Sequence, residues 1–332
     1  MQTTILGALP KLPVNYDDPD NIRRAISAFE AGRIGPEALE AVHMRTQARA
    51  LAWQEEAGID LVGDGQTRFQ DLLSPLCLDV SGMEVGGLVR FFQNNMYYRH
   101  PIITGRLSLE GRTLAGWVRE AQRFTALPLK TSLPGPFTVA RLSEDRQYGT
   151  LDRILADLSE VLGLVAKGLL EAGASVVEFE EPALVREPDP ALRAQGLFAL
   201  RAASQRAAAC GPVRVSLYFG DPSDWLADLA DLAALPLDGV SFDLVEAPRL
   251  ASRLASDGFP GRVGLGVLDA RDLRPEDPAS VRARVEPIAH RMGAERLLLH
   301  PNTSLEYLTS DGAVRKLHIL SAVAQEFKEV SR

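Results

Sequence analysis

The chain has 332 residues, 46% of them hydrophobic, and a formal net charge of −8. This length allows one large α/β domain, and the negative charge without any basic run argues against a nucleic-acid partner. The sequence has no basic and apolar leader at its beginning and no apolar run long enough to cross a membrane, so we expect a cytoplasmic protein.

Short β-like runs alternate along the chain with longer helical patterns, which is typical of a parallel sheet covered by helices. The β-like runs lie at residues 3–9, 60–65, 127–133, 175–180, 213–219, 239–245, 262–268 and 296–300. Between them, apolar residues recur at intervals of three and four, most clearly from Leu151 to Leu169 and from Val314 to Phe327. The sequence therefore predicts an α/β protein, a single (β/α)8 TIM barrel formed as one domain over residues 1–332.

Two stretches exceed what a barrel requires. Helical patterns at residues 21–30 and 36–57, joined by AGRIGP, predict an N-terminal helical extension. Residues 71–126 are too long for one crossover, and the segment FFQNNMYYRHPIITGRLSLEGR is typical of extended strands joined by a turn. We predict that residues 71–126 form an inserted β-hairpin region at the barrel mouth.

The stretch VVEFEEPAL, residues 176–184, places three glutamates in and after a strand of Val and Phe. Because successive strand side chains face opposite ways, Glu178 and Glu180 share one face. Inside a barrel a carboxylate needs a partner, so we expect Glu178 to pair with an interior polar or basic group and Glu180 to line the top. We expect Glu181 to turn toward the following loop.

Polar residues gather at the carboxyl ends of the predicted strands, where (β/α)8 barrels carry their active sites. These ends carry Ala8, Asp64, Gln66, Glu180, Glu181, Tyr218, Asp243, Asp269, Arg271, Asn302 and Thr303. Acidic groups predominate, which suggests a bound amine, a bound metal or carboxyls with raised pKa values, the amine being the simplest. The alternative is that Glu180 and Asp243 pair with Arg141, Arg186 or Arg271 and only close the barrel top.

Metal-binding and anion-binding motifs give weak signals. Cys77 and Cys210 lie far apart, and no histidine stands at a zinc-like spacing, so the spacing predicts no metal site. His300 ends the last predicted strand. The loop SLPGPFT, residues 132–138, could bring backbone N–H groups to an anion, but Pro-Gly-Pro is more often a tight turn.

In order, the stretches ILGALP, EEAGIDLVGDGQTR, NNMYYRHP, LPGPFTVARLS, VVEFEEPAL, LYFGD, DLVEAP, LGVLDARDLR and HPNTSLEYL resemble the catalytic barrel of cobalamin-independent methionine synthase. They cover nearly the whole chain. The resemblance implies a methyltransferase of methionine biosynthesis, which moves a methyl group from 5-methyltetrahydrofolate or another donor to the thiol of homocysteine. It also implies a zinc ion that binds the thiol as thiolate.

The chain departs from the family at the implied zinc ligands. A histidine and two cysteines are replaced by Ser216, Tyr218 and Thr303, whereas Asp243 stands where the family has a carboxylate. Zinc as a cofactor therefore stays uncertain, and no metal ligand is assigned. The stretches LYFGD, DLVEAP and LGVLDARD are closer to the zinc-free N-terminal barrel of the two-barrel enzymes.

The implied amino-acid pocket is also altered. Ala8, Gln66 and Glu180 replace the family's serine, glutamate and aspartate, and Arg271 replaces its proton-donating histidine. An aromatic residue that helps the family bind folate falls near Leu142 and is absent. Recognisable motif positions are kept at Asp64, Glu181, Asp269 and Arg274.

We therefore predict a methionine-synthase-like methyltransferase with Asp64, Tyr218, Asp243 and Arg271 as catalytic residues. The predicted substrate-binding residues are Ala8, Gln66, Glu180, Glu181, Asp269, Asn302 and Thr303, with Glu180 and Asp64 holding a substrate ammonium group.

Two alternatives stay open beside the methyltransferase. One is a barrel or accessory subunit that binds a folate or an amino acid without turnover, or that works with an accessory protein. The other is a metal-independent lyase or decarboxylase that uses Asp64, Tyr218 and Arg271 as acid, base and carboxylate clamp.

Overall fold

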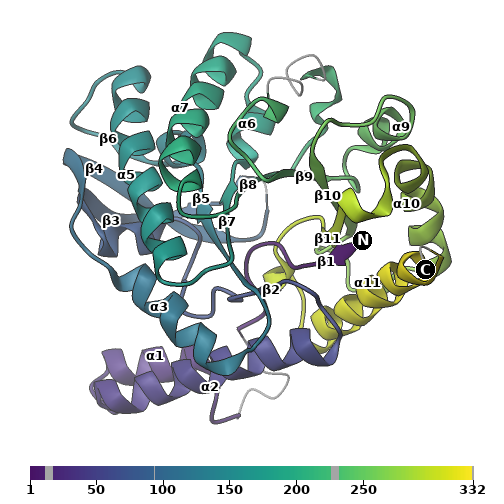
Figure 1. The fold of residues 1–332 in the computed structure, drawn as a ribbon. Helices are drawn as coiled ribbons and strands as arrows, with labels where there is room; N and C mark the ends of the chain where they lie inside the picture. Colours follow the sequence, from purple (N-terminus) through teal and green to yellow (C-terminus); the bar gives the residue numbers. More distant parts are fainter. Residues whose placement is uncertain (12–17, 93, 226–231, 331–332) are drawn as a thin grey trace.

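The computed structural model describes residues 1–11, 18–92, 94–225 and 232–330. Eight parallel strands form its main sheet: β1 (Gln2–Thr3), β2 (Val62–Gly63), β5 (Leu129–Pro134), β7 (Val176–Glu180), β8 (Val213–Leu217), β9 (Gly239–Asp243), β10 (Arg262–Leu268) and β11 (Leu297–Pro301). Their order is β1-β11-β10-β9-β8-β7-β5-β2. A parallel bridge between Thr4 and Leu61 joins the two ends, so the sheet closes into the predicted (β/α)8 barrel (Figure 1).

Helices surround this ring in the order expected for a barrel (Figure 1). They are α3 (Thr113–Ala121), α4 (Pro136–Leu142), α5 (Leu151–Glu171), α6 (Pro182–Arg186), α7 (Pro190–Ala208), α9 (Pro248–Ser256), α10 (Pro278–Met292) and α11 (Ser310–Val330). The two clearest helical patterns of the sequence became α5 and α11. Leu155, Leu158 and Leu162 of α5 are buried, as their spacing predicts. No helix in the described part of the chain is apolar over a length that would span a bilayer.

The N-terminal extension is confirmed as two helices, α1 (Ile22–Glu30) and α2 (Pro36–Glu56). Buried Ile22 and Ala25 of α1 pack with Val42 of α2 in a small apolar cluster of their own. The helix α2 also occupies the place of the barrel helix between β1 and β2, so α1 is the added element.

The inserted hairpin is also confirmed, with β3 (Val80–Arg90) antiparallel to β4 (Tyr97–Leu109). The short strand β6 (Glu144–Asp145) adds to its edge. The rest of residues 71–126 holds the barrel helix α3, whose first turn is capped by Asp79. The Asp79 carboxylate accepts the N–H groups of Thr113 at 2.7 Å and Leu114 at 2.9 Å.

The barrel interior contains the basic partner predicted for Glu178. The Lys130 ammonium forms an ion pair with the Glu178 carboxylate and donates to the backbone oxygen of Ile5 at 2.6 Å. The hydroxyl of Ser241 donates to the other Glu178 oxygen at 3.2 Å. Burial is the largest single influence on the pKa of Glu178 and raises it, but the charge and hydrogen bond of Lys130 act in the opposite direction, and the pKa lies below its ordinary value.

Candidate functional site

An aromatic cluster from the hairpin covers the barrel mouth above β8. Phe91 and Tyr98 of the hairpin pack with Tyr218 and Phe219, which follow β8, and the Phe91 and Phe219 ring centres lie 6.0 Å apart. The Tyr98 hydroxyl donates to the Leu142 backbone oxygen at 3.0 Å. The hairpin aromatics therefore pack over the end of β8, where Tyr218 and Phe219 are buried.

Backbone strain also concentrates at this mouth. In the described part of the chain, the non-glycine residues with positive φ are Gln66 at 47°, Phe92 at 51° and Phe219 at 67°. Gln66 follows β2, Phe219 follows β8, and the ring centres of Phe92 and Phe219 lie 5.7 Å apart. A left-handed conformation costs an L-residue on the order of 1–2 kcal/mol, and such strain clusters at functional sites.

Glu180 ends β7 at the top of the barrel, as predicted, and is 2% exposed. Its Oε2 accepts a hydrogen bond from the Tyr218 hydroxyl at 2.7 Å, whereas its Oε1 is buried and has no partner among the residues that the structure describes. Burial is the main cause that raises the pKa of Glu180 to about 7, and the nearby Glu178 charge adds to it. A buried carboxylate oxygen without a donor is costly, so it marks a place where a ligand donor can bind.

The prediction for Glu181 is wrong: its side chain does not turn toward the loop that follows β7 but reaches the start of α4, which follows β5. Its carboxylate accepts the N–H groups of Phe137 at 2.9 Å and Thr138 at 2.8 Å, and the Thr138 hydroxyl at 2.6 Å. The anion that the SLPGPFT loop receives is thus a side chain of the chain itself. These donors satisfy Glu181, so its place is structural rather than facing a substrate.

The contact between Glu181 and Gly135 gives a first prediction. A Cβ atom at Gly135 would lie 2.2 Å from the Glu181 carboxyl carbon, so Gly135→Ala must displace Glu181 from its three donors. We expect a loss of about 1–3 kcal/mol in the free energy of unfolding, measured by urea denaturation. Gly168→Ala in α5, where a Cβ meets nothing within 4 Å, is the control and should be neutral or stabilising. Equal stabilities of the two variants would contradict this account of Glu181.

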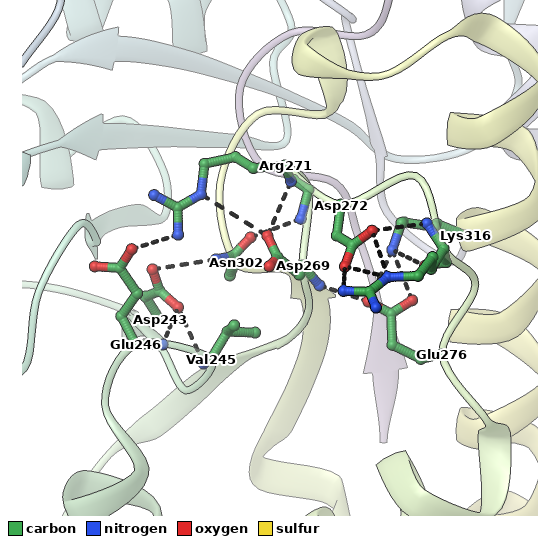
Figure 2. A network of polar contacts seen from close by, with 11 residues as sticks. Asp243, Val245, Glu246, Asp269, Arg271, Asp272, Glu276, Asn302 and Lys316 are labelled. Carbon is green, nitrogen blue, oxygen red and sulfur yellow. Dashed lines mark hydrogen bonds and ion pairs between the residues drawn. The ribbon is translucent and has the colours of Figure 1, made fainter. Parts of the chain in front are cut away.

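Asp243 ends β9 and holds the adjoining loop (Figure 2). Its Oδ1 accepts the N–H groups of Val245 and Glu246, both at 3.0 Å, and its Oδ2 accepts the side-chain amide of Asn302 at 3.3 Å. Burial dominates and raises the pKa of Asp243 to about 6. Asp243 and Asn302 thus lie together at the rim, although β10 separates β9 from β11 in the sheet.

Arg271 lies beside this pair but is bound to other acids (Figure 2). Its guanidinium forms an ion pair with Glu246 and lies 3.8 Å from Asp269 at Nε. It also lies over the Phe219 ring at 5.7 Å from the centroid. Among the described residues, no ion pair joins Arg271 to Glu180 or Asp243. The alternative in which Arg271 pairs with these two acids and closes the barrel top is therefore wrong for Arg271. Because its charge is already matched, Arg271 is a poor carboxylate clamp.

Asp64 and Ala8, which follow β2 and β1, lie farther around the rim, and Thr303 follows Asn302 after β11. Asp64 accepts the Thr131 hydroxyl at 2.6 Å and the N–H of Gln66 at 3.1 Å. Burial raises its pKa. The N–H of Ala8 donates to the Ser304 hydroxyl at 3.1 Å, which ties the loop after β1 to the loop after β11. Thr303 is buried beside Ser304.

The predicted acids therefore share one rim but not one cluster. Glu180 with Tyr218, Asp243 with Asn302, and Asp64 with Thr131 each form a local pair. Residues that sequence reasoning missed are Phe91, Phe219, Thr138, Glu246 and Ser304. The paired aromatics in FFQNN and the Thr in LPGPFT were visible, but nothing in the sequence indicated their partners.

A closed parallel ring with polar groups at its carboxyl rim defines a (β/α)8 barrel of the enzyme type. The chain belongs to a particular family of such barrels: the family model described as "Cobalamin-independent synthase, Catalytic domain" matches residues 1–326. It is thus a methionine-synthase-like protein of a methyltransferase family.

Curated relatives agree with this family. The chain is 24% identical over 320 residues to a protein named "Methionine synthase" from Saccharolobus solfataricus, covering 96% of this chain and 92% of that one. It is 25% identical over 321 residues to a protein of the same name from Sulfolobus acidocaldarius, with 96% and 89% covered.

Solved structures agree on the fold. A B12-independent methionine synthase from Shewanella sp. W3-18-1, in complex with selenomethionine, has a TM-score of 0.81 at 20% identity, over 99% of this chain and 98% of that one. A putative vitamin-B12-independent methionine synthase from Listeria monocytogenes has a TM-score of 0.76 at 16% identity, over 98% of each chain.

The family is zinc-dependent, but the side chains at the implied ligand positions do not fit zinc. Tyr218 donates its hydroxyl to Glu180, and Ser216 and Thr303 offer neutral hydroxyls rather than thiolate or imidazole. Among the residues that the structure describes, no three His, Cys, Asp or Glu side chains are grouped to hold a metal. Asp243 alone is a suitable donor type, and its oxygens already accept three hydrogen bonds.

This mismatch gives a second prediction. We expect the purified protein, after dialysis against zinc-containing and then zinc-free buffer, to retain zinc well below one ion per chain by elemental analysis. The triple variant Ser216→His, Tyr218→Cys, Thr303→Cys, which restores the family's donors beside Asp243, is the matched positive control. One zinc per chain in the unaltered protein would show that other residues supply the ligands.

Proposed function

We propose that this protein is a methyltransferase that transfers a methyl group from 5-methyltetrahydrofolate, or another methyl donor, to the thiol of homocysteine or a related amino thiol. Membership of the methionine synthase family supports the reaction class. The observation that carries the proposal to this chain is Glu180, with one oxygen held by Tyr218 and the other buried without a partner.

In this proposal Glu180 binds the ammonium group of the amino acid through Oε1. Tyr218 keeps the carboxylate oriented, because its hydroxyl is a fixed donor whose own pKa burial raises well above 10. The Shewanella relative, a complex with selenomethionine, supports an amino acid of this kind as ligand. Charge pairing in a site that the aromatic cluster shields from water is stronger than pairing in bulk solvent.

Asp243 is the proposed base for the thiol. With a pKa of about 6 it is largely ionised at neutral pH and can accept a proton from a thiol of ordinary pKa near 8.5. The thiolate sulfur then forms a bond to the methyl carbon, the bond from that carbon to the donor breaks, and its electron pair stays on the donor, which takes up a proton. No step of this scheme uses a metal.

A second candidate is a barrel that binds the amino acid or a folate without turnover. It is favoured by one observation, namely that Ser216, Tyr218 and Thr303 cannot supply the family's zinc donors. Asp64, Gln66 and the other rim residues then serve recognition alone. The two candidates differ in product formation and agree in ligand binding.

The deciding experiment incubates the protein with homocysteine and either 5-methyltetrahydrofolate or methylcobalamin, and measures methionine by mass spectrometry. We expect methionine in wild type, a raised KM for homocysteine in Glu180→Gln, and a lowered kcat in Asp243→Asn. Saturable binding of homocysteine without methionine would instead support the binding barrel. Neither binding nor product would refute both.

A further inference from the structure

A cavity of about 390 Å³ opens beside the barrel mouth and is separate from the acids described above. We call it the rim cavity. It lies between α1, α2, the loops after β1, β2 and β11, and the base of the hairpin turn. None of the predicted site residues lines it. Its volume falls in the range of small-molecule sites in proteins.

The rim cavity is lined by more cations than anions, although the whole protein carries a net charge of −8. The basic side chains of its wall are Lys11, Arg23, Arg68 and Arg99, and the acidic ones are Glu30 and Glu306. A local excess of positive charge attracts anions, even when the protein as a whole is acidic.

Two of these cations are free to meet a ligand. Lys11 is held by Glu306 at 3.1 Å. The guanidinium groups of Arg23 and Arg99 have no ion-pair partner among the described residues; that of Arg99 donates to the neutral side chain of Gln70 at 3.3 Å, while the Arg99 backbone N–H donates to Asp71 at 3.1 Å. Of the carboxylates in the wall, Glu30 alone opposes them. Two guanidinium groups without a carboxylate can bind an anion by charge-assisted hydrogen bonds.

The wall also holds buried nitrogens without partners. The side chain of Arg68 is only 8% exposed; its terminal nitrogens are bound to Glu40 and Glu120, but its Nε has no acceptor. Nδ1 of His43 is likewise buried, and no described residue bonds to it. Burial is the main cause that lowers the pKa of His43 to about 4, so this imidazole is neutral at pH 7. Unsatisfied buried donors of this kind are rare unless a ligand or water completes them.

The remainder of the wall is apolar. Ile22 and Ile26 of α1 face the cavity together with Phe69, Met96 and Leu308. Inorganic anions would leave this surface in contact with water. The wall therefore suits a molecule with an apolar body as well as a negative end.

We propose that the rim cavity binds a small organic acid, with an apolar or aromatic body against Ile26, Phe69 and Met96 and its carboxylate between Arg23 and Arg99. This site is separate from the amino-acid site and does not depend on the proposed methyl transfer. Because its wall combines α1, the hairpin and the barrel loops, an occupied cavity ties the two added elements to the barrel.

Phthalate, an aromatic dicarboxylate, is the test ligand, with inorganic phosphate and benzamide as probes of charge alone and ring alone. We expect phthalate to raise the melting temperature saturably and to bind more tightly than either comparison compound by calorimetry. The double variant Arg23→Gln, Arg99→Gln should weaken phthalate binding at least about tenfold. Both side chains are exposed, so the variant is expected to fold, which circular dichroism checks.

Arg33→Gln is the matched control, since Arg33 is exposed in the same helical extension but does not line the cavity. It should leave phthalate affinity unchanged, and so should Glu180→Gln at the barrel mouth. Phosphate binding more tightly than phthalate, equal affinity in the double variant, or no saturable binding would each overturn the proposal.

Discussion

Replacing Lys130 by Met is expected to cost about 3–5 kcal/mol in the free energy of unfolding, the largest effect of any substitution considered. Lys130 is buried at the centre of the barrel, where its ammonium pairs with Glu178 and donates to the Ile5 backbone oxygen. Without it, Glu178 stays buried with the Ser241 hydroxyl as its remaining donor. Urea denaturation at pH 7 measures the change.

Two further variants are the controls for this measurement. The double variant Lys130→Met, Glu178→Gln removes the stranded charge and should recover part of the loss. Lys167→Met breaks the exposed pair of Lys167 with Glu171 on α5 and should change stability by less than about 1 kcal/mol. Comparable losses in the buried and the exposed variant would contradict the role assigned to the interior pair.

Glu180→Gln should make the protein more stable above pH 7, by up to about 3 kcal/mol, while leaving it unchanged near pH 4. The folded pKa of Glu180 is raised to about 7 from 4.5, so between these values the folded state binds a proton that the unfolded state lacks. Stability from this residue is therefore fully present below pH 4.5 and is lost as the pH rises through 7. Glutamine can keep the Tyr218 hydrogen bond without the charge.

The measurement is urea denaturation of wild type and Glu180→Gln from pH 4 to pH 8.5. Glu181 and Asp243 also have raised pKa values, but they are present in both proteins and cancel in the difference. Glu110→Gln, at an exposed position, is the control and should show no pH-dependent gain. A variant that loses stability at every pH would mean that the Glu180 carboxylate holds the fold rather than a ligand.

The barrel could be predicted because each of its strands leaves a local pattern, and all eight predicted runs overlap a strand of the ring. The lengths of the strands could not be predicted in this way. The runs at residues 3–9 and 60–65 overlap only the two-residue strands Gln2–Thr3 and Val62–Gly63, and farther along each run the backbone has positive φ, at Gly7 and Gly65. The helix α3 within the long insertion was not predicted either. Its capping residue, Asp79, lies before the whole hairpin in the sequence, so no local capping pattern marks the start of the helix.

The site was predictable in position but not in pairing. Strand alternation placed Glu178 inside and Glu180 at the top, and both are there. Which carboxylate oxygens of Glu180 and Glu181 accept hydrogen bonds depends on contacts between residues far apart in the chain. Glu181 caps α4 from 43 residues away, and the phenol of Tyr218, which follows the neighbouring strand β8, reaches Glu180 at the end of β7. The position of the aromatic cluster above these residues depends on the direction in which the hairpin leaves the barrel, and no local sequence pattern predicts that direction.

The measurement that tests the account most directly is calorimetric titration of homocysteine at pH 6 in two buffers that differ in ionisation enthalpy. If Glu180 receives the ammonium group, binding must ionise a carboxyl that is protonated at this pH, and about one proton should be released per ligand. Glu180→Gln should bind more weakly and release none. Binding of equal strength in both proteins, with no proton exchanged in wild type, would contradict the assignment of Glu180 as the amino-acid site.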